Sequence, residues 1–95
     1  MDNKYQTGKI YKILSPSTNK MMIACTYKSL EQEMKTLKNV YNRRINNAVL
    51  KNQLTPKQKI YGCGDCVMVL IEDYPCRTNH ELTERKKYHI KNLII

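Results

Sequence analysis

The segment GKIYKILSPSTNKMMIACT, Gly8 to Thr26, has the pattern of two short strands joined by a polar turn. Residues 9–14 alternate in a β-rich stretch, and residues 20–27 form an apolar run typical of a strand buried on both faces. The intervening SPSTN is built from residues that favour turns. The segment therefore predicts a β-hairpin.

Two helices are expected next in the chain. Ser29 and Gln32 form a capping-box pattern, and apolar residues at 30, 34, 37 and 41 then fall on one helical stripe. We expect a second helix over residues 43–54, ended by Thr55 and Pro56, because proline disfavours helix at the residue before it.

The last third of the chain predicts one more strand and one more helix. Residues 66–73, CVMVLIED, form a continuous apolar run that predicts a buried strand in the centre of the sheet. Thr78 and Glu81 form a second capping-box pattern that predicts a final helix. The expected fold is α+β, a single domain over residues 1–95. Its small three-stranded antiparallel sheet is flanked by helices, in the order strand, strand, helix, helix, strand, helix.

The chain of 95 residues carries 17 Lys and Arg against 8 Asp and Glu, a net charge of +9. Such an excess favours polyanionic partners, nucleic acid first and an anionic protein surface second. No apolar run approaches the roughly 20 residues that span a bilayer, and the first residues lack the pattern of a signal peptide. We expect no membrane partner and an intracellular location, in cytoplasm or nucleus, with the four cysteines as free thiols.

The positive charge is concentrated between residues 28 and 59, which contain eight basic and two acidic residues, a net charge of +6. No Phe or Trp accompanies them, so contact with phosphates and no reading of bases is expected. The basic residues of this segment are Lys28, Lys35, Lys38, Arg43, Arg44, Lys51, Lys57 and Lys59.

The CGDC sequence at Cys63 to Cys66 has the spacing of one half of a zinc site. Structural zinc usually needs two such pairs, and a second pair is absent from the sequence. We therefore interpret CGDC as a turn before a strand and expect neither zinc nor another metal.

Three separated segments, in this order and spacing, resemble a GIY-YIG nuclease domain across nearly the whole chain. KIY at residues 9–11 and MIA at residues 22–24 stand at the two signature triplets. CTYKSLEQEMKTLK, residues 25–38, resembles the helix that follows, and VLIEDYPCRTNHELTERKKYHI, residues 69–90, resembles the third strand and the last helix. The sequence of these segments is most similar to GIY-YIG domains of large DNA viruses and phages. This similarity adds a virion-associated location as an alternative.

The resemblance implies a site made of two tyrosines, an arginine, a histidine and a metal-binding glutamate. Tyr11 is the signature side chain that this sequence keeps. The other four positions hold Met22, Glu33, Leu37 and Lys86. Glu33 places a carboxylate where an arginine would bind the phosphate, and Lys86 places an ammonium where a glutamate would bind the metal. Both substitutions argue against metal-dependent cleavage.

These substitutions have three interpretations. Met22 and Leu37 are also what packing alone would select at strand and helix positions. In a second interpretation, Glu33 and Lys86 form an ion pair across the nuclease site that the resemblance implies. In a third, Glu84 is the metal ligand instead of Lys86, although it points to another side of the helix.

Three functions follow as alternatives. The first is a catalytically degenerate nuclease-like domain that binds nucleic acid, DNA before RNA, or a protein partner through its basic surface, without a cofactor. The second is an active endonuclease that uses Tyr11 and Mg²⁺, and the third is a structural or assembly protein of a viral particle. The expected nucleic-acid contacts are Lys9, Lys28, Lys35, Lys38, Arg43, Arg44, Lys51 and Lys86.

Overall fold

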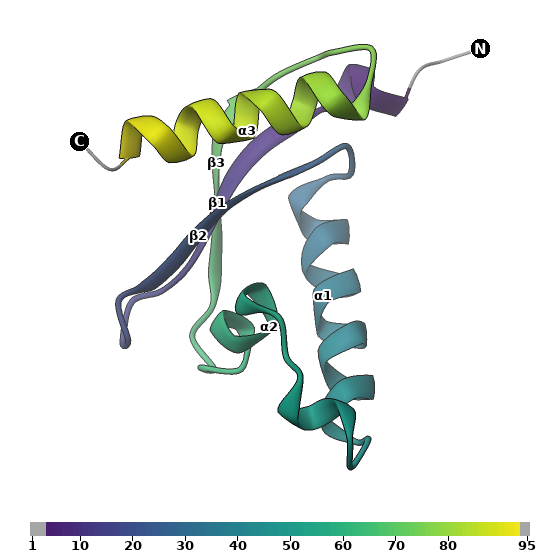
Figure 1. The fold of residues 1–95 in the computed structure, drawn as a ribbon, viewed down its shortest axis with the longest axis vertical. Helices are drawn as coiled ribbons and strands as arrows, with labels where there is room; N and C mark the ends of the chain where they lie inside the picture. The colour runs from purple at the N-terminus through teal and green to yellow at the C-terminus, as the bar shows by residue number, and fades with distance from the viewer. Residues whose placement is uncertain (1–3, 94–95) are drawn as a thin grey trace.

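In the computed structural model, which describes residues 4–93, a three-stranded antiparallel sheet lies between helices (Figure 1). The elements are the 3₁₀-helix η1 (Lys4–Thr7), β1 (Lys9–Ser15), β2 (Lys20–Thr26), α1 (Leu30–Ile45), the 3₁₀-helix η2 (Leu50–Asn52), α2 (Pro56–Tyr61), β3 (Val67–Asp73) and α3 (Asn79–Leu93). The α+β class and the order of strands and α-helices predicted from the sequence are confirmed.

The β1–β2 hairpin forms as predicted. Its register runs from Lys9 opposite Thr26 to Ser15 opposite Lys20. Asn19 closes the turn with φ of 60°, a conformation that asparagine tolerates better than most residues. Burial on both faces holds only for the second half of β2, because Lys20 and Met21 are exposed while Ile23, Ala24 and Thr26 are buried.

The sheet order is β2-β1-β3, so β1 is the central strand and the prediction that residues 66–73 form the centre is wrong. The side chains of Val67, Val69, Leu70 and Ile71 are between 36% and 44% exposed. An apolar run is compatible with a central or an edge strand, and pairing decides between them. Here both neighbours pair with β1, which leaves β3 with an open edge.

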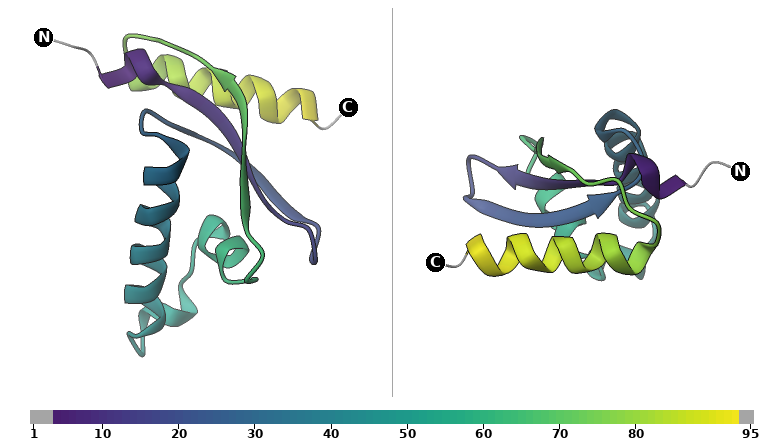
Figure 2. Two further views of the ribbon diagram at one scale, coloured as in Figure 1. Left: turned by 180° about the vertical axis from the view of Figure 1, so that it is seen from behind. Right: turned by 90° about the horizontal axis from the view of Figure 1, so that it is seen from above.

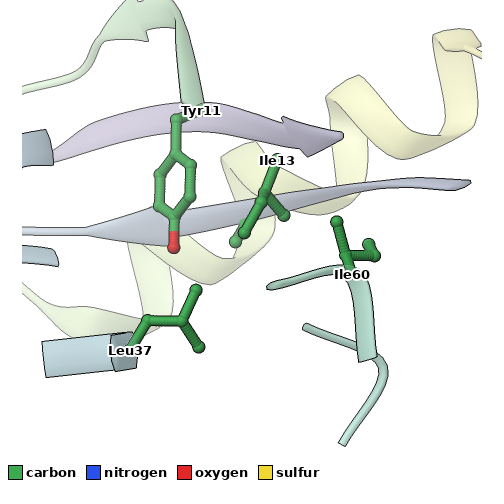
Figure 3. Close-up of a cluster of buried hydrophobic side chains, with 5 residues drawn as sticks. Tyr11, Ile13, Leu37 and Ile60 are labelled. Atoms are coloured by element: carbon green, nitrogen blue, oxygen red, sulfur yellow. The ribbon is translucent and has the colours of Figure 1, made fainter. Parts of the chain in front are cut away.

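Helices cover the two faces of the sheet, α1 and α2 on one face and α3 on the other (Figure 2). Side chains alternate along β1, so Tyr11 and Ile13 point to the first face and Ile10 to the second. On the first face they meet Leu37 of α1 and Ile60 of α2 (Figure 3). The small core is therefore divided into two clusters by the sheet.

The second helix lies later in the chain than predicted. α1 continues to Ile45, and the segment expected to be helical over residues 43–54 instead contains a turn and the short η2. α2 begins at Pro56, where Thr55 and Gln58 form a complete capping box. Proline fits the first helical position because its missing N–H is unpaired there in any helix. Pro56 therefore begins a helix, whereas the sequence pattern predicts that it follows the end of one.

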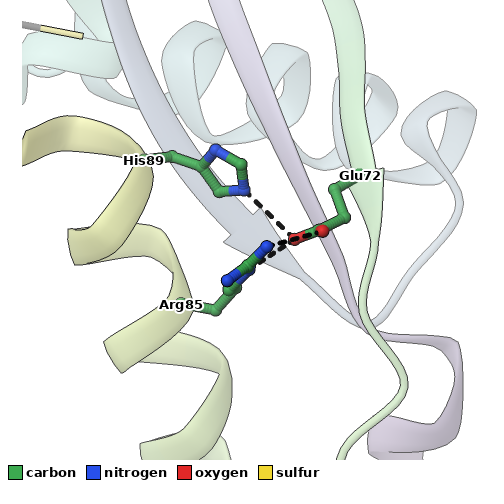
Figure 4. Close-up of polar contacts among 3 residues, drawn as sticks. All are labelled: Glu72, Arg85 and His89. Carbon is green, nitrogen blue, oxygen red and sulfur yellow. Dashed lines mark hydrogen bonds and ion pairs between the residues drawn. The ribbon is translucent and has the colours of Figure 1, made fainter. Parts of the chain in front are cut away.

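A β-bulge in β3 positions Glu72 for its contact with α3. Ile10 pairs with Glu72 but its neighbour Tyr11 pairs with Leu70, so Ile71 is an extra residue in β3. The bulge lets Glu72 face α3, where Arg85 donates to its two carboxylate oxygens at 2.6 and 2.8 Å (Figure 4). His89 Nε2 lies 3.1 Å from the same carboxylate. This three-residue cluster ties the edge strand to the last helix.

The molecule is flat, with extents of 40 × 37 × 20 Å. Its radius of gyration of 14.2 Å exceeds the roughly 12 Å expected for a compact domain of this length. The helices within residues 4–93 do not reach the length and apolar character that crossing a bilayer requires. A flat molecule presents wide faces for its size.

Candidate functional site

A hollow of about 400 Å³ is bounded by α1, the start of α2 and β2. Its walls include Met22, Glu33 and Leu37, three of the positions singled out in the sequence, and Lys57 of α2. Tyr11 packs in the same core cluster as Met22 and Leu37, with its ring pointing from β1 toward α1 (Figure 3). The structure therefore gathers positions that are widely separated in the sequence around this space, which we call the Tyr11 hollow after the residue packed behind its wall.

Tyr11 is completely buried, and its hydroxyl accepts a hydrogen bond from Lys57 Nζ at 2.9 Å. The same ammonium lies 5.6 Å from the centre of the Tyr11 ring. In the sequence, Lys57 stood out only as one basic residue among many. Its position beside Pro56, in the first turn of a helix that was predicted elsewhere, is why its pairing with Tyr11 was missed.

The environment of Tyr11 keeps its hydroxyl protonated. Burial raises the pKa of Tyr11 far above its usual value, and the negative charge of Glu33 raises it further. A general base must give up its proton near the working pH, and a phenol that is buried beside a carboxylate does not. Tyr11 is thus placed to pack and to orient Lys57.

Lys86 of α3 and Cys25 of β2 do not line the hollow, because Cys25 packs in the cluster on the other face of the sheet, which α3 covers. Burial raises the pKa of the Cys25 thiol, while the positive charges of Lys86 and then Lys57 oppose that rise. Glu33 adds to it. Cys25 therefore stays a neutral thiol, and the charges around it are two ammonium groups and one carboxylate.

The suggested ion pair between Glu33 and Lys86 is not formed. Within residues 4–93 the ion pairs join Glu72 to Arg85 and His89, and Glu84 to Lys87. Glu84 is exposed and borders a different hollow on α3. The alternative in which Glu84 serves the Tyr11 hollow therefore lacks support in the fold.

The cysteines are free thiols throughout the described chain, and they are dispersed. Cys63 donates to the carbonyl oxygen of Lys59 at 3.4 Å, whereas Cys66 packs against the core beside Met68. Within residues 4–93, no three His, Cys, Asp or Glu side chains gather as a metal site would require. CGDC follows α2 and leads into β3, the position that its interpretation as a turn implied.

The expected nucleic-acid contacts are spread over the molecule, with the largest group on α1. Lys35, Lys38 and Arg43 are exposed along that helix, and Lys28 lies just before it. Arg44 donates to the Gln53 carbonyl at 3.1 Å and so ties α1 to the segment that follows. Of the remaining three, Lys51 is exposed on η2, Lys86 lies on α3 near Cys25, and Lys9 Nζ donates to the Thr7 carbonyl at 2.8 Å.

The ion pairs of the described chain all lie on β3 and α3. The basic residues between 28 and 59 therefore have no carboxylate partner within residues 4–93.

Comparison with the known protein families, with curated proteins and with solved structures finds no match to this chain.

Proposed function

We propose that this protein is a nucleic-acid-binding domain on a GIY-YIG-like frame, which binds phosphates through α1 and the segment after it and does not cleave them. The observation that carries the proposal is the uncompensated positive charge between residues 28 and 59. The ion pairs of residues 4–93 lie elsewhere, so these side chains keep their full charge for a polyanion. Each phosphate that is neutralised releases counterions, which drives binding at low salt.

The Tyr11 hollow supports the second half of the proposal. The Tyr11 hydroxyl is buried and accepts a hydrogen bond from Lys57. The raised pKa of Tyr11 opposes a role as a general base. Glu33 brings negative charge to the wall of the hollow, where it would repel a phosphate. Lys86 stands at the position that the family resemblance assigns to a metal-binding carboxylate, and its charge would repel a divalent cation.

The test is a salt titration of binding to a fluorescent duplex DNA, read by anisotropy. Affinity is expected to fall steeply with salt, with a logarithmic slope of about 0.9 for each phosphate neutralised. The double variant Lys38→Gln, Arg43→Gln should reduce that slope by about 2. The matched control Lys87→Gln, Lys91→Gln removes the same charge from α3. Equal losses in both variants, or binding that does not respond to salt, would reject the assignment to α1.

Cleavage is tested separately on supercoiled plasmid with Mg²⁺ or Mn²⁺. We expect the plasmid to stay intact at protein concentrations that saturate binding. Nicking that disappears in Tyr11→Phe would overturn the non-cleaving part of the proposal and support an endonuclease. Binding and cleavage are scored independently, so either half of the proposal can fail alone.

A further inference from the structure

Another hollow lies at the opposite end of α1 from η2 and differs in chemistry from the Tyr11 hollow. It has a volume of about 430 Å³ and is lined by Tyr27, Lys28, Gln32, Lys35 and Thr36. One aromatic ring, two ammonium groups, an amide and a hydroxyl thus surround one space. From the sequence, no aromatic group was expected to serve beside the basic residues, and the fold supplies one from the end of the hairpin.

The Tyr27 ring is held in place and remains accessible. It is nearly perpendicular to the Tyr5 ring, with ring centres 5.7 Å apart, and Lys4 Nζ lies over the Tyr27 ring, 4.8 Å from its centre. Its backbone carbonyl accepts a hydrogen bond from Thr7 Oγ1 at 2.6 Å. Tyr27 is nevertheless 36% exposed. A ring that is already ordered loses little conformational entropy when a flat ligand stacks on it.

The charges around this hollow favour an anion beside the ring. Lys28 and Lys35 line it directly, and Lys4 stands against the Tyr27 ring. Glu31 lies one helical turn before Lys35, but the ion pairs of the described chain do not include it. A phosphate would therefore meet two or three ammonium groups that carry no internal counter-charge.

We propose that this hollow binds one unstacked nucleotide of a single strand, its base against Tyr27 and its phosphate at Lys28 and Lys35. The proposal rests on the proposed nucleic-acid binding and names the form of nucleic acid preferred. Bases inside a duplex hide their faces in the stack, whereas those of single strands, flaps and ends can stack on an aromatic side chain. Gln32 and Thr36 can each donate or accept, so no particular base is selected.

The experiment compares two fluorescent probes by anisotropy at one salt concentration: oligothymidine of about 12 nucleotides, and a duplex of similar length closed at both ends by hairpin loops. Wild type should bind oligothymidine more tightly. Tyr27→Leu should weaken that binding roughly 5- to 100-fold and change duplex binding little. Tyr88→Leu is the matched control, because Tyr88 is an exposed tyrosine beside a cation on α3.

Lys35→Gln is the second variant, since Lys35 is exposed on the surface and its exchange leaves the packing of Tyr27 intact. It should lower oligothymidine affinity and reduce the salt slope by about 0.7. Thermal unfolding monitored by circular dichroism verifies that both variants are folded. If Tyr27→Leu loses its fold, Lys35→Gln decides the outcome.

The outcomes separate this inference from the proposed function. Selective loss of oligothymidine binding in Tyr27→Leu, together with a loss in Lys35→Gln that is larger for oligothymidine than for the duplex, supports it. Equal affinity of wild type for both probes, or unchanged oligothymidine binding in the variants, overturns the inference and leaves duplex binding standing. Failure of wild type to bind either probe at low salt rejects both.

Discussion

Replacing Glu72 by glutamine tests whether the cluster on α3 holds the edge strand in place. The substitution keeps the shape of the side chain and removes its charge. In the native structure Arg85 donates to both carboxylate oxygens, at 2.6 and 2.8 Å, and His89 lies 3.1 Å away (Figure 4). The amide of the variant would retain one acceptor oxygen, so the bidentate pairing with Arg85 is lost while the packing stays.

The size of the effect follows from this geometry and from solvent access. A hydrogen bond to a charged group contributes about 1.5–3 kcal/mol when it is well shielded. The side chains of Glu72 and Arg85 are each 30% exposed, so water screens the pair and lowers its contribution. We expect Glu72→Gln to reduce the free energy of unfolding by about 1–2 kcal/mol near neutral pH. In a domain of this size each kcal/mol lowers the Tm by about 4–8 °C.

The pH dependence of stability provides a second, independent test. The hydrogen bonds from Arg85 and then His89 hold the pKa of Glu72 at about 2, below its ordinary value of 4.5. A depressed pKa means that the stabilisation is fully present above the ordinary pKa and is lost as the pH falls through the folded value. Wild type should therefore lose part of its stability between about pH 5 and pH 2, and Glu72→Gln should lose less over the same range.

Urea denaturation followed by circular dichroism measures both effects, at about pH 7 and about pH 3. The control is Glu84→Gln, which removes the same charge from an exposed pair with Lys87 at 3.4 Å. That control should change stability by less than about 0.5 kcal/mol. The reasoning is refuted if the two substitutions are equivalent at neutral pH, or if wild type and Glu72→Gln lose stability in parallel on acidification.

Two further substitutions probe the candidate site and the open edge. Tyr11→Phe removes the acceptor of the Lys57 hydrogen bond from a fully buried position and should lower the free energy of unfolding by about 0.5–1.5 kcal/mol, measured in urea; an unchanged midpoint would contradict the role given to this bond. Val69→Glu places a carboxylate opposite Lys12 on the exposed, apolar strand β3 and should reduce concentration-dependent self-association in light scattering. Scattering equal to that of wild type at high concentration would show that this edge does not drive association.

Much of the secondary structure could be predicted because it depends on neighbouring residues. The hairpin was visible in its alternation and turn residues, and the start of α1 in Ser29, whose side chain accepts from the amide of Gln32 at 3.1 Å. The start of α3 was visible in the same way, since Thr78 accepts from the Glu81 amide at 3.2 Å. The second helix lies later than the sequence pattern predicts, because proline suits both the end of a helix and its first turn, and Pro56 occupies the first turn of α2.

Three of the candidate positions lie together in the structure, because Met22, Glu33 and Leu37 line one hollow. Lys57 was not foreseen as the partner of the Tyr11 hydroxyl, because that contact joins residues that are 46 apart in the sequence. A contact across such a distance depends on how α2 packs against the sheet.

By itself, the sequence determined the basic charge, the kinds of element and the order in which they occur, because these depend on composition and on patterns within a few residues. Only the tertiary structure decided that β1 is central, that the bulge at Ile71 turns Glu72 toward Arg85, and that the Tyr27 ring packs against Tyr5. Each of those outcomes depends on strand pairing or packing between distant segments. Such contacts form through surfaces that no local pattern encodes.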